Sequence, residues 1–272
     1  MFHGVDAACE ATLLTTFRGP HLRHSAPTRR TIEGPAPAAP MPTSAPLQPA
    51  DLAQVPLFAD LSPEQHQRLL EQHRTVSFQA DQQLVLEQDE SQGLFLLRSG
   101  LTKVRTFTAD GSEAVLGLLG PGDVLGEMAV LEMGGRRTAD VVCLLACTAV
   151  MLRAGPFRGL LASEPRLALA LARLEANRLQ NLNRRFCQQS GDATTRVLAA
   201  LADLACHTAT GAAATAPIPP LPQSELAILC GLARETTSRT LSKLRQKGTI
   251  IDTEDGGIKL ADLTPLRRRG LL

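Results

Sequence analysis

The chain has 272 residues, 44% of them hydrophobic, so it is long enough to bury two modest cores. Its 28 Lys and Arg residues nearly balance 27 Asp and Glu residues, which gives a formal charge of +1. This balance excludes a globally basic protein, so any binding to nucleic acid must come from a local patch.

Residues 1–50 are rich in Pro, Ala, Thr and Arg and show no sustained apolar period, which predicts a disordered extension. Met41 is an alternative start of translation. No apolar run reaches the roughly 18 residues of a membrane span, and the N-terminus lacks a compact apolar signal region. We therefore expect a cytoplasmic protein without a membrane association.

The chain has six cysteines: Cys9, Cys143, Cys147, Cys187, Cys206 and Cys230. They include no C-x-x-C pair, and several of them lie in apolar runs. This pattern favours small buried side chains in a reducing compartment. The six histidines are scattered along the chain. Because a metal site needs ligands clustered at short spacings, we expect no metal.

The segment that starts at Leu52 has a helical pattern, with Ser62 as the N-cap and Pro63 at the first helical position. From Thr75 to Arg153 the pattern changes to many short apolar runs separated by turn residues. Such regularly spaced short strands predict an antiparallel roll or barrel.

Residues 120–141 carry the clearest functional signal. A Gly-Pro-Gly turn and a short strand over 123–125 are followed by Gly126, which opens a helical run. Glycine has no Cβ, so the backbone can approach an anion closely, and helix N-termini attract negative charge. Arg137 and Thr138 could complete a phosphate cradle.

Glu127 lies beside this cradle, where a carboxylate would repel a bare phosphate but could accept a hydrogen bond from a ribose hydroxyl. At these residues the chain resembles the cyclic-nucleotide-binding domains of the cyclic AMP receptor protein superfamily of bacterial regulators. The resemblance implies that cyclic AMP, or else cyclic GMP, binds at Gly126, Glu127, Met128, Ala129, Arg137 and Thr138. We call residues 126–139 the cassette. The alternative is that the cassette persists only as a folded turn and binds no cyclic nucleotide.

A long helix is predicted over 163–190, with Ser163 as its N-cap. Its apolar seam consists of Leu167, Leu171, Leu174, Leu179, Leu182 and Phe186. A helix that leaves a compact roll with such a seam needs a partner, and a symmetric homodimer is the economical solution.

The family resemblance implies further roles for this helix. It implies that Arg178 pairs with Glu127, and that Leu182 and Asn183 lie at the ligand. Relatives that read adenine carry a Thr-Ser pair where this chain has Leu182 and Asn183, which leaves the choice of nucleobase open.

The C-terminal segment begins with Asp192 as a helix N-cap. The pattern then predicts a helix from residue 223, a glycine-containing turn over 230–232 and a second helix, which is typical of a helix-turn-helix. A hairpin that turns at 255–257 fits the wing of a winged helix. The outward face of the second helix is locally basic, which suits DNA but also suits plain solvation.

The string R-E-T-T-S-R in this second helix resembles the recognition helix of the same family. An arginine can donate two hydrogen bonds to guanine, and a glutamate can accept one from cytosine. The resemblance implies base readers at Arg234, Glu235 and Arg239. It extends the DNA-binding set to Thr236, Ser238 and Lys243.

These patterns predict an α+β chain with a β-roll over 51–162, a central dimerisation helix over 163–190 and a winged helix-turn-helix over 191–272. We expect a homodimeric transcription regulator that binds a cyclic nucleotide, palindromic double-stranded DNA and RNA polymerase. The first rival is a regulator of the same fold with another effector or none. A regulatory subunit acting on a protein partner is disfavoured by R-E-T-T-S-R, and no nucleophile–base pairing or triphosphate loop suggests an enzyme.

Overall fold

The computed structural model describes residues 47–131, 135–208 and 214–272. Most of the predicted extension, with Cys9 and Met41, lies outside these ranges. Helix α1 (Pro49–Leu52) includes the last two residues of that extension. The reason is local, because the side chains of Gln48 and Asp51 form a reciprocal capping box at its first turn.

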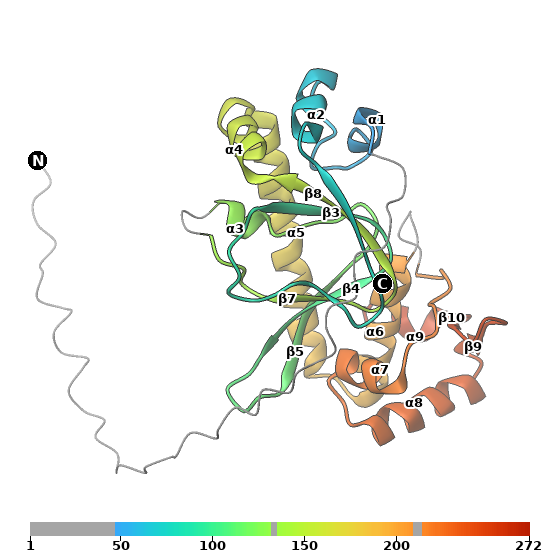
Figure 1. The fold of residues 1–272 in the computed structure, drawn as a ribbon. Helices are drawn as coiled ribbons and strands as arrows, with labels where there is room; N and C mark the ends of the chain where they lie inside the picture. Colours follow the sequence, from blue (N-terminus) through green and yellow to red (C-terminus); the bar gives the residue numbers. More distant parts are fainter. Residues whose placement is uncertain (1–46, 132–134, 209–213) are drawn as a thin grey trace, which may run out of the picture. The chain divides into compact units, whose positions relative to one another are not determined.

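The N-terminal part of the described chain is an antiparallel roll, as predicted (Figure 1). Its strands are β1 (Arg74–Phe78), β2 (Gln83–Val85), β3 (Gly93–Ser99), β4 (Thr102–Phe107), β5 (Glu113–Leu119), β6 (Val124–Leu125), β7 (Asp140–Cys143) and β8 (Cys147–Arg153). They form two four-stranded sheets, with the orders β1-β8-β3-β6 and β2-β7-β4-β5. Every pairing within these sheets is antiparallel.

The strand reversals lie where the turn residues predicted them. Gly100, between β3 and β4, has a φ of +94°, and Gly111, between β4 and β5, has a φ of +82°. Glycine tolerates this left-handed region because it has no Cβ. The first sheet and the helices beside it enclose one apolar core, which includes Leu94, Val150 and Leu152.

The segment with a helical pattern from Leu52 forms a helix from Pro63, the first helical position that the sequence predicted, but not over residues 53–62. Helix α1 ends at Leu52, and α2 (Pro63–Leu70) starts only after a series of turns. Pro56 cannot donate a backbone hydrogen bond and so interrupts a continuous helix. Phe58, two residues later, is fully buried, and its ring contacts the ring of Phe157. The capping prediction is confirmed, since Ser62 Oγ accepts a hydrogen bond from Gln65 N at 3.3 Å.

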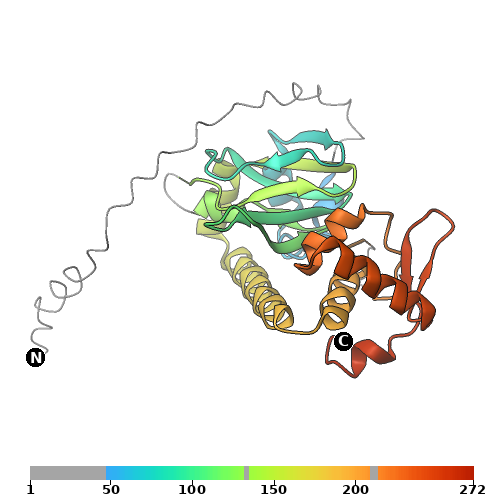
Figure 2. The ribbon, with the colours of Figure 1, turned by 90° about the horizontal axis from the view of Figure 1, so that it is seen from below.

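The roll is followed by α4 (Ala154–Ser163) and by the long helix α5 (Pro165–Gln189), whose 25 residues lie within the predicted range 163–190. Ser163 is not the N-cap of α5, because it ends α4 and its Oγ donates to Gly159 O at 3.2 Å. Glu164 is the N-cap, without a side-chain cap bond. Figure 2 shows α5 leaving the roll before the chain turns back into α6.

The C-terminal part is a winged helix-turn-helix. Its elements are α6 (Ala193–Thr208), α7 (Gln223–Cys230), α8 (Arg234–Gln246), β9 (Ile250–Asp252), β10 (Ile258–Leu260) and α9 (Thr264–Arg267). Asp192 Oδ1 accepts from Thr195 N at 2.7 Å, which confirms the predicted cap of α6. Gly231 has a φ of +59° and ends α7 in the left-handed conformation that the turn requires.

Among the helices of the described ranges, none is long and apolar enough to cross a membrane. The longest, α5, carries charged and polar side chains along most of its length and buries only Leu167 and Leu171.

Candidate effector and DNA-binding sites

A cavity of about 640 Å³ lies between the cassette, β4, β5, α5 and α6. Eight of the nine predicted ligand residues line it: Gly126, Glu127, Met128, Ala129, Arg137, Thr138, Arg178 and Leu182. The fold thus brings the cassette and the central helix together at one cavity. Asn183 is exposed and is not among the lining residues.

Arg137 is the buried cation of this cavity. Its Nη1 donates to Gly126 O at 2.9 Å and its Nη2 to Gly93 O at 2.7 Å. Its guanidinium also lies over the ring of Phe95, with Cζ 5.8 Å from the centroid. A guanidinium has five N–H donors, so these two bonds leave three for a ligand.

Burial lowers the pKa of Arg137, and the nearby carboxylates of Glu127 and Asp89 act in the opposite direction. A cation that has lost part of its hydration interacts strongly with any anion that enters the same cavity. The site is therefore suited to a phosphate.

Gly126 is required by this geometry for two reasons. Its φ is +81°, and a Cβ at this position would lie 1.7 Å from Nη1 of Arg137. Any side chain would thus push the guanidinium out of its place. The sequence signal for glycine before the short helix α3 (Glu127–Leu131) therefore has a definite steric cause.

Glu127 links the cassette to the central helix. It is 3% exposed, and its Oε1 accepts from Nη1 of Arg178 at 2.6 Å. Arg178 also donates to Val124 O, which anchors it to β6. Within the described part of the chain, no donor reaches Oε2 of Glu127. A buried carboxylate oxygen without a partner is costly, so it is an acceptor suited to a ligand hydroxyl.

Thr138 and Met128 are the exposed members of the cassette. Thr138 Oγ1 lies 3.9 Å from Met128 Sδ, and both side chains line the cavity. Ala129 is buried beneath them. The threonine hydroxyl is consequently accessible to a ligand beside Arg137.

Helix α8, the second helix of the helix-turn-helix, has two distinct faces. Thr237, Thr240, Leu241 and Leu244 are buried against the rest of the unit. The predicted contact residues Arg234, Glu235, Arg239 and Lys243 are exposed, whereas Thr236 and Ser238 are half-buried. Arg239 Nε donates to Glu235 O at 3.3 Å, so its guanidinium retains donors for a further partner.

Comparison with known proteins supports this two-part organisation. Residues 75–164 match the cyclic nucleotide-binding domain family, and residues 195–269 match the Crp-like helix-turn-helix domain family. The cyclic AMP receptor protein of Thermus thermophilus is 32% identical over 198 residues, 72% of this chain and 88% of its own length.

The CRP-like cAMP-activated global transcriptional regulator of Mycobacterium tuberculosis is 27% identical over 220 residues, 80% of this chain and 97% of its own. The solved structure of the c-di-GMP responsive global regulator CLP of Xanthomonas campestris has a TM-score of 0.59 at 22% identity. That similarity covers 74% of this chain and all of that one, and it shows a shared fold.

The chain belongs to the cyclic AMP receptor protein family. It is accordingly a transcription regulator with a cyclic nucleotide-binding domain and a helix-turn-helix DNA-binding domain, and not an enzyme. The predicted fold is confirmed by the same comparisons and by the architecture of the described residues.

Glu175 also lines the cavity, although the sequence analysis did not predict it as a ligand-binding residue. Its Oε1 lies 3.2 Å from Nη1 of Arg178, so it shares that guanidinium with Glu127. Burial raises the pKa of Glu175, and the neighbouring charge of Glu127 raises it further. Glu175 stands one helical turn before Arg178, and that spacing is the only signal that could have indicated it.

Two further contacts hold the DNA-binding unit together. Arg245 of α8 forms an ion pair with Asp252 of β9, with Nη2 2.8 Å from Oδ1. Arg196 of α6 donates to the carbonyls of Cys230 and Gly231 and so fixes the turn. These arginines are structural ties within the unit.

Proposed function

We propose that the chain acts as a homodimeric transcription regulator that binds a cyclic nucleotide and, in response, palindromic operators in double-stranded DNA. Cyclic AMP is the effector that we put forward first, and cyclic GMP is the second candidate. Cyclic AMP comes first because the similar regulator of Mycobacterium tuberculosis is cAMP-activated.

One observation carries the proposal: among the described residues, the buried Glu127 Oε2 has no hydrogen-bond partner, and it lies in the same cavity as Arg137, whose two hydrogen bonds to backbone carbonyls leave further donors. A cyclic nucleotide offers a ribose hydroxyl and a phosphate diester next to each other. The hydroxyl would donate to Glu127, and the phosphate oxygens would accept from Arg137 and Thr138. A simple anion could pair with Arg137 but not with Glu127, because the Glu127 carboxylate would repel it.

The nucleobase would lie along α5, toward Leu182. This side chain lines the cavity and is apolar, so it provides stacking area without a hydrogen-bonding preference. Asn183 would have to reach the ligand of a second chain, since it is exposed and does not line the cavity of its own chain. Titration with both nucleotides decides which base is preferred.

Dimerisation is supported by the seam of α5. Leu179, Leu182 and Phe186 are 59%, 41% and 74% exposed in the single chain. Large apolar side chains at helical spacing gain free energy when a second copy covers them. A twofold axis along α5 would also place two recognition helices in symmetric positions, which matches a palindromic operator.

Base reading is assigned to Arg234, Glu235 and Arg239 at the exposed N-terminal half of α8. Lys243 and the more buried Thr236 and Ser238 would support these contacts. Because the whole chain carries a charge of only +1, affinity for DNA would depend on this local patch. We further propose that the DNA-bound dimer meets RNA polymerase and that the protein works in the cytoplasm.

Isothermal titration calorimetry with cyclic AMP and cyclic GMP tests the proposal. Saturable binding of one nucleotide at one site per chain, together with tighter binding to DNA in its presence, is the expected result. If neither nucleotide binds, a regulator with another effector or none becomes the better assignment. Cyclic di-GMP belongs in the same titration series as a representative of that rival.

A further inference from the structure

Lys103 of β4 is a buried cation that the effector and DNA sites leave unexplained. Lys103 is 2% exposed. Its Nζ lies 2.7 Å from Glu113 Oε1 of β5 and 2.7 Å from Glu225 Oε2 of α7. Glu225 belongs to the first helix of the helix-turn-helix. The ion pair therefore joins the roll to the DNA-binding unit across 122 residues of sequence.

Apolar packing surrounds this ion pair. Val115 and Leu118 of β5 share one core with Leu198, Leu226 and other side chains of the DNA-binding unit. Leu118 lies directly opposite Lys103 in the β4–β5 register, so the two side chains stand on the same face of the hairpin. Water is largely excluded there, which strengthens the attraction and makes its loss costly.

The same hairpin forms part of the wall of the effector cavity. Val104, next to Lys103 in β4, lines the cavity, as do its register partner Gly117 and the adjacent Leu118 in β5. Successive side chains of a strand point to opposite faces. Lys103 is therefore adjacent in the strand to the cavity-lining Val104, and its own register partner Leu118 lines the cavity as well.

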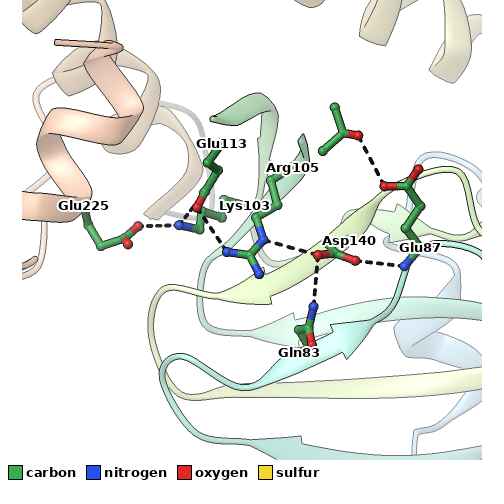
Figure 3. Close-up of polar contacts among 8 residues, drawn as sticks. Gln83, Glu87, Lys103, Arg105, Glu113, Asp140 and Glu225 are labelled. Atoms are coloured by element: carbon green, nitrogen blue, oxygen red, sulfur yellow. Dashed lines mark hydrogen bonds and ion pairs between the residues drawn. The ribbon is translucent and has the colours of Figure 1, made fainter. Parts of the chain in front are cut away.

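A chain of polar contacts extends from Lys103 through Glu113, Arg105 and Asp140 to Glu87, as Figure 3 shows, and backbone hydrogen bonds continue it to the cassette. Glu113 Oε2 accepts from Arg105 Nη1 at 3.1 Å, and Arg105 Nε donates to Asp140 Oδ2 at 3.4 Å. Asp140 Oδ1 in turn accepts from Glu87 N at 2.8 Å. The next residues, Gln88 and Asp89, pair with the backbone of Arg137 at 2.9 Å each.

We propose that the Lys103–Glu225 ion pair is an intrachain latch, and that the β4–β5 hairpin couples the effector cavity to the helix-turn-helix of its own chain. The latch itself depends only on the described contacts. The coupling half rests on the proposed function, since it requires an effector in the cavity. This route is additional to any signal that passes along α5 to a second chain.

Hydrogen exchange of the full-length protein without effector tests the latch. Glu225→Gln removes the interdomain charge and leaves Lys103 paired with Glu113. Amides of β5 and α7 should exchange about tenfold faster in this variant, because one buried cation loses a partner. The matched control is Asp252→Asn, which breaks the exposed ion pair with Arg245 inside the DNA-binding unit and should leave β5 unchanged.

A second variant, Lys103→Met, keeps the DNA-binding unit's own sequence and should give the same faster exchange of α7. It guards against the case in which Glu225→Gln merely unfolds α7. If the amides of β5 and α7 in Glu225→Gln and Lys103→Met exchange as slowly as in Asp252→Asn, the latch is refuted.

The coupling is tested by adding cyclic AMP to the same samples. In the unmodified chain, the nucleotide should change exchange in α7. Glu225→Gln should still bind it, since no cavity-lining residue is altered, but the response of α7 should be lost. An equal response in both proteins would refute the coupling. If calorimetry shows that cyclic AMP does not bind the unmodified chain, the proposed effector fails, while the effector-free comparison still judges the latch.

Discussion

Arg178 Nη1 lies 2.6 Å from Glu127 Oε1, which ties the central helix α5 to the cassette helix α3 over 51 residues of sequence. The same guanidinium also contacts Glu175 of its own helix and Val124 O of β6. The position of α5 is therefore set by one cation that three elements share. A ligand that bonds to the free oxygen of Glu127 would act directly on this junction.

Replacement of Arg178 by Met should destabilise the chain, because it leaves Glu127 as a buried carboxylate without a cation. We expect a loss of about 2–3 kcal/mol in the free energy of unfolding, less than for a fully buried pair since Arg178 is partly exposed. Urea unfolding measures it. Adding Glu127→Gln should restore most of the stability, and a single variant as stable as the unmodified chain would contradict the assignment.

Arg137→Ala should weaken binding of the cyclic nucleotide by about 100-fold, because it removes the charge-assisted hydrogen bonds to the phosphate. Arg136 is a matched control, as it is the adjacent arginine and its side chain is exposed. Arg136→Ala should bind within about threefold of the unmodified chain, given the low worth of exposed charges. Calorimetry on both variants decides, and equal losses would point to a nonspecific charge effect.

Gly126→Ala should abolish effector binding, whereas Gly122→Ala should not. Both residues have positive φ, of +81° and +92°, so both variants lose about 1–2 kcal/mol of stability from backbone strain. Only at Gly126 would the new Cβ collide with Arg137, since the described residues leave the space at Gly122 open within 4 Å. Thermal unfolding and effector titration of the pair separate strain from collision. Similar effector affinity in the two variants would be evidence against the cradle.

Arg239→Ala should lower affinity for a specific operator by about 10- to 100-fold, since each bidentate contact to guanine contributes about 1–3 kcal/mol of discrimination. The operator is obtained by selection of random-sequence DNA with the unmodified protein, and gel-shift titration gives the affinities. Lys247→Ala, which changes an exposed cation beyond the end of α8, should reduce affinity only slightly and equally on all sequences. An unchanged operator affinity for Arg239→Ala would argue against α8 as the reading helix.

Phe186→Ser should raise the dissociation constant of the dimer by about 1,000-fold, because burial of a phenylalanine contributes about 2 kcal/mol and the change occurs twice in a symmetric pair. Leu169→Ser is the control, since Leu169 is 52% exposed on the same helix but lies away from the stripe of Leu179, Leu182 and Phe186. Analytical ultracentrifugation measures both. A seam that does not mediate dimerisation would give two variants with the same association.

Local features of this chain were predictable because their cause is local. Ser62 and Asp192 accept the capping bonds that their positions require, and Gly231 adopts the left-handed conformation expected of the helix-turn-helix turn. Two boundaries were wrong, namely the end of the predicted extension and the N-cap of α5, and both have a local cause. Ser163 satisfies its hydroxyl within α4, which a pattern of cap residues does not distinguish from a new helix start.

By itself, the sequence determined the order of roll, long helix and helix-turn-helix, and it marked the cassette through glycine, glutamate and arginine at fixed spacings. Only the tertiary structure decided which charges meet. Periodicity fixes the face of an element on which a residue lies, but the partner of that face depends on packing between distant segments. The sharing of Arg178 with Glu175 and the burial of Lys103 between Glu113 and Glu225 therefore emerged only from the folded chain.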